Sequence, residues 1–353
     1  MRVTHLGSTR VALDIGGANL KAAHDAGPSI CVPFELWRKP EGLRDAIHRL
    51  LASLPAFDSL LLTMTGELCD CFETRKAGVS FILSAVFGAS KSIPTSVWCV
   101  DSRFRTPIEI IDEPLLAASS NWIGLAKVAA RIAENGPGLL VDVGSTTTDL
   151  VPMAGGKPRH RGRTDLERLR SGELVYAGVR RTPLAAIASS LRFRSESIGL
   201  CAERFAETLD VYLTLGSIPP DPADLGTADG RPATRDAARS RLARMVGEDR
   251  DGFNNDDAED LARSADSALL DRLELSARAA CHATIGHPIH AVVSGSGEFL
   301  ATRLARRLVG PAGRVLSLSE LWGPAGSEAA CARALLELTR TVVPIDSPRG
   351  GEN

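Results

Sequence analysis

A short pattern occurs twice in this sequence, 128 positions apart, and this duplication constrains the fold more than any other feature. Residues 11–21 read VALDIGGANLK, and residues 139–150 read LLVDVGSTTTDL. Each copy is an apolar run that ends in an aspartate, followed by glycine and small residues and then by a second apolar run. This order is typical of a strand, a tight turn and an antiparallel return strand. One copy alone would fit an ordinary β-hairpin, whereas the pair indicates a duplicated functional loop.

The two turns have the composition of anion-binding sites. Glycine lets a turn backbone approach a ligand closely, and successive N–H groups of a turn form a concave site for oxyanions. An aspartate at the end of the first strand can hold Mg²⁺, directly or through water. We therefore predict that the turns face each other and clamp a polyphosphate, with Asp14 and Asp142 toward Mg²⁺; the alternative role of both aspartates is turn capping. The predicted phosphate-binding residues are Gly16, Gly17, Asn19, Gly144, Ser145, Thr146 and Thr147.

Two further segments are candidates for phosphate binding. Residues 294–298 (SGSGE) follow an apolar strand and precede a helix, so their N–H groups and the helix dipole suit an anion or the sugar of a nucleotide. Residues 180–182 (RRT) stand at the start of a predicted helix and would clamp phosphate, unless the arginines form a salt-bridged surface pair. The predicted binding residues of these two segments are Gly295, Ser296, Gly297, Arg180 and Arg181.

Composition narrows the class of protein. The chain has 353 residues, 44% of them hydrophobic and 24% charged, with a net charge of −2, as expected for a globular protein of about two domains. We expect no nucleic-acid partner and no membrane association. The seven cysteines are scattered, which favours reduced thiols in the cytoplasm. Cys281, His282, His287 and His290 lie close together, but a capped helix end explains them better than a metal site does.

The order of predicted elements divides the chain into two lobes. We predict an N-terminal lobe at residues 1–137 with the first turn, and a C-terminal lobe at residues 138–346 with the second. A mainly helical insertion occupies about residues 183–283 of the second lobe, and residues 347–353 form a disordered tail. Within these lobes we expect one long helix from Pro114 to about residue 133, because proline suits a first helical turn.

Longer strings of residues sharpen this interpretation. Residues 63–72, 142–149, 172–183, 202–206 and 227–234 stand in order across about residues 10 to 340. With its paired aspartate-glycine turns, the chain resembles the actin-like ATPase and sugar kinase superfamily. Within that superfamily it is similar to hydantoinase/oxoprolinase-related proteins of tetrahydromethanopterin-linked one-carbon transfer. The resemblance implies an α/β fold with two ribonuclease-H-like lobes and a helical insertion in the second lobe.

The resemblance also implies an activity. Members of this family act as a synthase in methanofuran biosynthesis, joining an aminomethylfuran-methanol diphosphate to the phenol of a tyramine or tyrosine glutamyl acceptor. An aryl ether forms and pyrophosphate leaves, so the implied partners are a small-molecule diphosphate and a phenolic acceptor, with Mg²⁺ as cofactor. Such an enzyme must neutralise the departing pyrophosphate and deprotonate a phenol whose ordinary pKa is about 10.

Candidate catalytic residues follow from this chemistry. Glu67 and Asp70 come after a strand end, where either would serve as the phenol base, and Lys21 would reach the phosphate. Asp210, with Tyr212 and residues 229–231, would line the pocket of the organic substrate. The alternative function is an ATP-dependent kinase or ATPase, in which the loop at residues 294–298 holds adenosine. A third hypothesis is a partner-binding protein without turnover. Independently of which function holds, an exposed apolar helix of the insertion could form a homodimer, but the sequence does not identify that helix.

Overall fold

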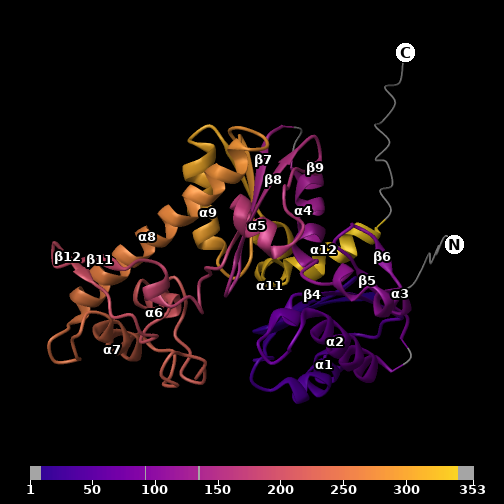
Figure 1. The fold of residues 1–353 in the computed structure, drawn as a ribbon, viewed down its shortest axis with the longest axis horizontal. Coiled ribbons are helices and arrows are strands. Elements are labelled where there is room, and N and C mark those ends of the chain that lie inside the picture. The colour runs from indigo at the N-terminus through magenta and orange to yellow at the C-terminus, as the bar shows by residue number, and fades with distance from the viewer. Residues whose placement is uncertain (1–8, 92, 134–135, 341–353) are drawn as a thin grey trace, which may run out of the picture.

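The computed structural model describes residues 9–91, 93–133 and 136–340, and Figure 1 shows two lobes with a further helical part beside them. The first lobe contains a mixed sheet with the strand order β3-β2-β1-β4-β5-β6. Its antiparallel β1–β2 hairpin is the first copy of the duplicated pattern, and β4 adds to β1 in parallel. The strands are β1 (Arg10–Ile15), β2 (Asn19–His24), β3 (Ser29–Pro33), β4 (Ser59–Met64), β5 (Thr95–Trp98) and β6 (Phe104–Arg105).

Helices cover this sheet and enclose an apolar core. Alternate residues of β1 and β4, such as Leu13 and Leu62, are fully buried against Ile47 and Val79 of the helices. Thr74 begins α2 by accepting a hydrogen bond from the Ala77 N–H, which is a helix N-cap. The helices of this lobe are η1 (Pro40–Gly42), α1 (Leu43–Ala52), η2 (Gly66–Leu68), α2 (Arg75–Ser90), α3 (Pro107–Asp112) and η3 (Pro114–Leu116).

The second lobe repeats the topology of the first. Its sheet has the order β10-β8-β7-β13-β14, in which the antiparallel β7–β8 hairpin is the second copy of the pattern and β13 adds to β7 in parallel. The prediction of an α/β fold with two lobes of one type is therefore confirmed. The strands are β7 (Gly138–Val143), β8 (Thr148–Ala154), β9 (Lys157–Pro158), β10 (Leu174–Val175), β13 (His290–Ser294) and β14 (Arg314–Ser317), and the helices that cover them include α5 (Asp165–Ser171), α9 (Glu298–Val309) and α10 (Leu318–Trp322).

Between β10 and β13 the chain leaves the sheet and forms the part at the lower left of Figure 1. This region is not helical throughout, because β11 and β12 form a hairpin within it. The turn of the hairpin has positive φ at Arg194 (48°) and Ser195 (69°), so no glycine marked it in the sequence. The elements are η4 (Leu184–Ala186), β11 (Ser190–Phe193), β12 (Glu196–Gly199), α6 (Thr208–Thr214), α7 (Arg235–Met245) and the long α8 (Asn255–His282) that returns to the sheet.

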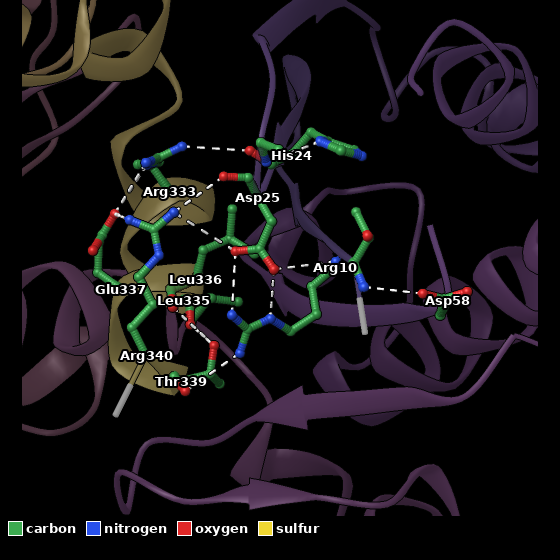
Figure 2. Close-up of polar contacts among 12 residues, drawn as sticks. Arg10, His24, Asp25, Asp58, Arg333, Leu335, Leu336, Glu337, Thr339 and Arg340 are labelled. Atoms are coloured by element: carbon green, nitrogen blue, oxygen red, sulfur yellow. Dashed lines mark hydrogen bonds and ion pairs between the residues drawn. The ribbon is translucent and has the colours of Figure 1, made fainter. Parts of the chain in front are cut away.

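Two helices lie between the sheets and give the lobes a shared core. Helix α4 (Asn121–Ile132) and helix α12 (Ala330–Thr339) pack with buried residues of both sheets, among them Leu61 of the first and Val292 of the second. Figure 2 shows the polar contacts that fix α12 to the first lobe: Arg10 donates to the Thr339 carbonyl in the last turn of the helix, and Arg340, just after it, pairs with Asp25. Helix α12, the last described element, therefore contacts both lobes.

The long helix predicted from Pro114 to about residue 133 is wrong, because the chain breaks between η3 and α4. Ser119 adopts a positive φ of 47°, which an α-helix does not allow. The hydroxyl of Ser119 bonds to Glu67, and that of Ser120 bonds to the Trp98 carbonyl. Serine side chains that find such partners compete with helical backbone bonding, and here they end the helix.

The last helical segment of the described chain is also divided. Helix α11 (Pro324–Glu328) and helix α12 are separated by Ala329. The predicted disordered tail at residues 347–353 lies outside the described residues. Within the described ranges, no helix combines the length and the apolar character needed to cross a membrane.

Candidate functional site

The two duplicated turns face each other across a cavity of about 290 Å³ between the lobes. The side-chain amide of Asn19 donates to the Ser145 hydroxyl at 3.3 Å, and this bond joins the two turns directly. The turn residues predicted from the sequence all line the cavity: Gly16, Gly17, Asn19, Gly144, Ser145, Thr146 and Thr147. The structure thus brings together the two halves of the predicted clamp.

Backbone donors at both turns are directed to no protein acceptor. The N–H of Gly16 closes the first turn on the Asn19 carbonyl, and the N–H of Gly144 closes the second on the Thr147 carbonyl. Among the described residues, the N–H groups that follow each glycine donate to no acceptor, namely those of Gly17, Ala18, Ser145 and Thr146. Unengaged successive N–H groups beside a cavity are the arrangement that binds an oxyanion.

Asp14 and Lys21 form the charged centre of the first turn. They are opposite each other in the β1–β2 register, so their side chains share one face of the sheet. Asp14 is buried, and its Oδ1 has no hydrogen-bond partner. Burial raises the pKa of Asp14, and the charge of Lys21 opposes this shift. Burial acts to lower the pKa of Lys21, but Asp14, Cys31, Cys331 and Asp142 together outweigh it, so the pKa is raised and the amine stays protonated.

Asp142 occupies the equivalent place in the second turn. It accepts a hydrogen bond from the Ser294 hydroxyl at 2.7 Å. Burial raises the pKa of Asp142 to about 6, with a further contribution from the nearby Asp149 carboxylate. The same lobe therefore holds two carboxylates close together, and their repulsion favours a cation beside them.

The loop at residues 295–297 supports Asp142 and does not line the cavity. The Gly295 N–H donates to the Ser327 carbonyl and hydroxyl, and the Gly297 N–H donates to the Val143 carbonyl. A Cβ at Gly295 would lie 2.2 Å from the Val143 carbonyl oxygen, so only glycine allows this close approach. Ser296 is exposed. The backbone donors of both glycines are thus used inside the protein.

Asp14 and Asp142 are the two carboxylates that could bind Mg²⁺ in this cavity. No group of three or more His, Cys, Asp or Glu side chains that could hold a metal ion exists in residues 9–91, 93–133 and 136–340. Mg²⁺ in phosphate-handling sites takes one or two protein carboxylates and fills the rest of its shell with water and phosphate oxygens. Asp14, with its unpartnered buried oxygen, and Asp142 fit that smaller requirement.

Side chains of the second lobe extend the site beyond the predicted residues. Asp149 lines the cavity opposite Asp142 in the β7–β8 register, and the Arg168 guanidinium donates to it at 2.7 Å. The Arg168 guanidinium carbon also lies 3.9 Å from the centre of the Trp122 ring. The sequence offered one signal for this group, because Asp149 has the same spacing from Asp142 that Lys21 has from Asp14.

The two arginines predicted to clamp phosphate have different positions. Arg181 lines the cavity and stacks on Trp37, with its guanidinium carbon 3.7 Å from the ring centre. Trp37 belongs to the first lobe, so this contact crosses the cavity. Arg180 instead bonds to Asp224 at 2.5 Å in the region between β10 and β13 and does not line the cavity.

The predicted bases do not open directly into the cavity. Asp70 is exposed on the surface, and Glu67 is buried behind the wall. Glu67 contacts the cavity through Ser119, whose hydroxyl donates to its Oε1 at 2.8 Å and lines the cavity. Asp165 on α5 lines the cavity from the second lobe and accepts from the same hydroxyl at 3.3 Å. Neither Ser119 nor Asp165 had a signal in the sequence.

The residues predicted to line an organic pocket have structural contacts instead. Asp210 is fully buried and bonds to the buried Arg241, which also bonds to Asp229. Tyr212 is buried against the Phe299 ring. None of these side chains lines the cavity. The apolar part of the cavity wall comes from other residues, namely Trp37, Leu68, Trp122, Leu174 and Tyr176.

The cavity lining therefore combines two kinds of chemistry. Turn N–H groups, carboxylates and Lys21 can bind a charged group, and aromatic and aliphatic side chains can contact an apolar one. Tyr176 is partly exposed, and burial of the rest of its ring raises the pKa of its phenol to about 12. Such a cavity can bind a ligand with a phosphate end and a flat organic end.

Comparisons with known proteins agree on one family. Residues 60–317 match the hydantoinase/oxoprolinase family model. The chain is 34% identical over 264 residues to (4-{4-[2-(gamma-L-glutamylamino)ethyl]phenoxymethyl}furan-2-yl)methanamine synthase of Methanocaldococcus jannaschii, which covers 74% of this chain and 78% of the relative. It is 35% identical over 133 residues to the synthase of the same name from Methanococcus vannielii, covering 38% of this chain and 60% of that relative.

Among solved structures, the nucleotide-free acetone carboxylase is similar with a TM-score of 0.49 at 14% sequence identity, covering 89% of this chain and 51% of that one.

Proposed function

The chain belongs to the hydantoinase/oxoprolinase family, and from this premise we propose that it is an enzyme that forms the aryl ether of a methanofuran-type cofactor. The reaction joins an aminomethylfuran-methanol diphosphate to a phenolic glutamyl acceptor and releases pyrophosphate, which makes the enzyme a transferase of a furanylmethyl group. The observation that carries the proposal is the cavity itself, which is lined both by the two anion-binding turns and by an aromatic wall made of Trp37, Trp122 and Tyr176.

The turns would bind the diphosphate through their free backbone donors. The N–H groups of Gly17 and Ser145 lie on opposite turns, so a diphosphate between them would be held from both lobes. Asp14 and Asp142 would hold Mg²⁺, which would neutralise part of the charge that develops on the departing pyrophosphate. Lys21, kept protonated by the neighbouring carboxylates, would supply further positive charge.

The aromatic wall would position the two flat reactants. Trp37 is partly exposed, and a furan or a phenol could stack on the ring face that Arg181 does not cover, whereas Arg168 already covers a face of the buried Trp122. Departure of pyrophosphate leaves a furanylmethyl cation that the ring oxygen stabilises, and the phenolate oxygen then forms the new C–O bond. Water must be kept away from that cation, and the contact of Trp37 with Arg181 across the cavity would help to exclude it.

The alternative of an ATP-dependent kinase finds less support. It would place adenosine at residues 294–298, but the N–H groups of Gly295 and Gly297 already bond to the protein and the loop does not line the cavity. We therefore propose the synthase alone, and the experiment below includes ATP as a parallel arm.

The test is a paired incubation of the purified protein. One arm contains Mg²⁺, the furan-methanol diphosphate and the phenolic acceptor, and the other contains ATP and the unphosphorylated furan alcohol. We expect pyrophosphate and the ether in the first arm, measured by a pyrophosphate assay and mass spectrometry. Asp14→Asn should abolish this turnover, whereas Asp112→Asn, which changes an exposed aspartate, should preserve it. ADP formed only in the second arm would refute the synthase.

A further inference from the structure

Glu67 is too deeply buried to reach a substrate, yet a serine connects it to the cavity. Only 1% of Glu67 is exposed, and it does not line the cavity, whereas Ser119 does. The Ser119 hydroxyl donates to Glu67 Oε1 at 2.8 Å. We propose that Ser119 is a catalytic residue that relays the proton of the phenolic acceptor to Glu67. This inference rests on the proposed function and names the base of that reaction.

The bonds around Ser119 leave room for one more donor. The Arg75 guanidinium donates to the Ser119 hydroxyl at 2.8 Å and to Glu67 Oε1 at 3.0 Å, so it orients both groups. A serine oxygen accepts two hydrogen bonds and donates one. With Arg75 on one lone pair and its own proton toward Glu67, Ser119 keeps one lone pair for a donor in the cavity. A phenol O–H is such a donor.

Glu67 has the properties of a proton acceptor. Its second oxygen, Oε2, is buried and has no hydrogen-bond partner, so nothing in the described structure holds that oxygen in its charged form. Burial raises the pKa of Glu67, which favours the protonated acid, and the Arg75 guanidinium and the Ser119 hydroxyl oppose this shift. A carboxylate balanced in this way can accept a proton and later release it.

The backbone at Ser119 is held in a costly conformation for this contact. A positive φ in a residue other than glycine is unfavourable and persists only where surrounding contacts enforce it. Ser119 has a φ of 47°, and its hydroxyl has bonds to Glu67, Arg75 and Asp165. The same conformation interrupts the helix and directs this side chain to the cavity wall.

The proposed step balances as a proton transfer. The phenol O–H bond breaks and its proton moves to the Ser119 oxygen, while the original Ser119 proton moves to Glu67 Oε1. Ser119 is unchanged, Glu67 becomes a carboxylic acid, and the phenolate electron pair forms the bond to the furanylmethyl carbon as pyrophosphate leaves. Asp165 also accepts from Ser119, but at 3.3 Å, so the shorter path leads to Glu67.

The experiment compares acceptors of different acidity. Ser119→Gly removes the hydroxyl and suits the positive φ, so the variant should fold. With a tyramine-type phenol of ordinary pKa, we expect turnover to fall about 100-fold, the lower range for loss of general base catalysis. With a ring-fluorinated acceptor roughly 2 to 3 pKa units more acidic than the ordinary value near 10, the loss should shrink to about fivefold or less. Glu67→Gln should show the same dependence on the acceptor.

Ser102→Gly is the matched control, because Ser102 also has a positive φ, of 66°, and does not line the cavity. Its turnover should equal that of the wild type with both acceptors. An equal loss with both acceptors in Ser119→Gly would overturn the relay while leaving the synthase reaction intact. Acceptor-dependent loss in Asp165→Asn, with none in Glu67→Gln, would overturn the assignment to Glu67. Absence of ether from the wild type with either acceptor would overturn the relay together with the proposed function.

Discussion

Asp142→Asn should become more stable than the wild type as the pH rises, because the wild-type carboxylate must ionise in a buried environment. Burial and the neighbouring Asp149 raise the pKa of Asp142 from an ordinary 3.8 to about 6. A group whose pKa is raised by folding contributes its full stability below the pKa of the unfolded chain, near 4, and loses it as the pH rises through the folded value, near 6. Asparagine cannot ionise and does not lose this contribution.

The size of the effect follows from the shift. A displacement of about two pKa units corresponds to about 3 kcal/mol between pH 4 and pH 7.5, at about 1.4 kcal/mol for each unit. For a chain of this length, 1 kcal/mol changes the unfolding midpoint by about 2 °C, so the variant should gain roughly 5 °C on the wild type across this interval.

The assay is thermal unfolding of both proteins at half-unit steps of pH. Asp112→Asn controls for the general effect of removing one negative charge, because Asp112 is exposed at the end of α3. Pyrophosphate with Mg²⁺ should reverse the order at pH 7.5, since ligand binding stabilises only the protein that binds it well. A difference between Asp142→Asn and the wild type that stays constant with pH would refute the reasoning from burial.

Two further predictions concern the parts that hold the second turn. Arg168→Met should lower the free energy of unfolding by about 3–5 kcal/mol, measured by urea denaturation, because it leaves the Asp149 carboxylate buried without its partner; adding Asp149→Asn should recover part of the loss. Gly178→Ala would place a Cβ 2.4 Å from the Gly144 carbonyl oxygen and displace the turn, so pyrophosphate affinity, measured by calorimetry, should fall at least about tenfold, roughly 1.4 kcal/mol. Gly199→Ala, whose Cβ meets nothing within 4 Å, should keep wild-type affinity.

The duplicated hairpins could be predicted because their signal is local. An apolar strand, an aspartate and a glycine turn lie within about a dozen residues, and the first apolar run, which ends at Asp14, lies within β1 (Arg10–Ile15). Ser119 could not be predicted in the same way. Its conformation depends on Glu67 and Arg75, which are 52 and 44 positions away, and the run Ser119-Ser120-Asn121 is only a weak signal for a helix start, because it does not show which partners these side chains bond.

The residues of the candidate site likewise differ in whether local sequence predicts them. Residues of the turns were identifiable because glycine and small hydroxyl residues suit phosphate. Trp37, Asp165 and Arg168 reach the cavity only through the packing of one lobe against the other, and their surroundings in the sequence are ordinary. Tyr176 lies in the string at residues 172–183 that carried the family resemblance, so the string marked the neighbourhood without indicating which side chain faces the cavity.

The duplication also indicates which positions are equivalent, and the charges at those positions differ. Lys21 and Asp149 both stand seven residues after a turn aspartate and opposite it in register. In the first lobe the lysine is the partner of the aspartate, so the charges there nearly cancel. In the second lobe Asp142 and Asp149 lie close together. The positive charge there comes from Arg168 on helix α5, and Arg168 binds Asp149. Burial, and after it the Asp149 carboxylate, therefore raises the pKa of Asp142 to about 6, and a cation in the cavity beside these two carboxylates would stabilise the second lobe.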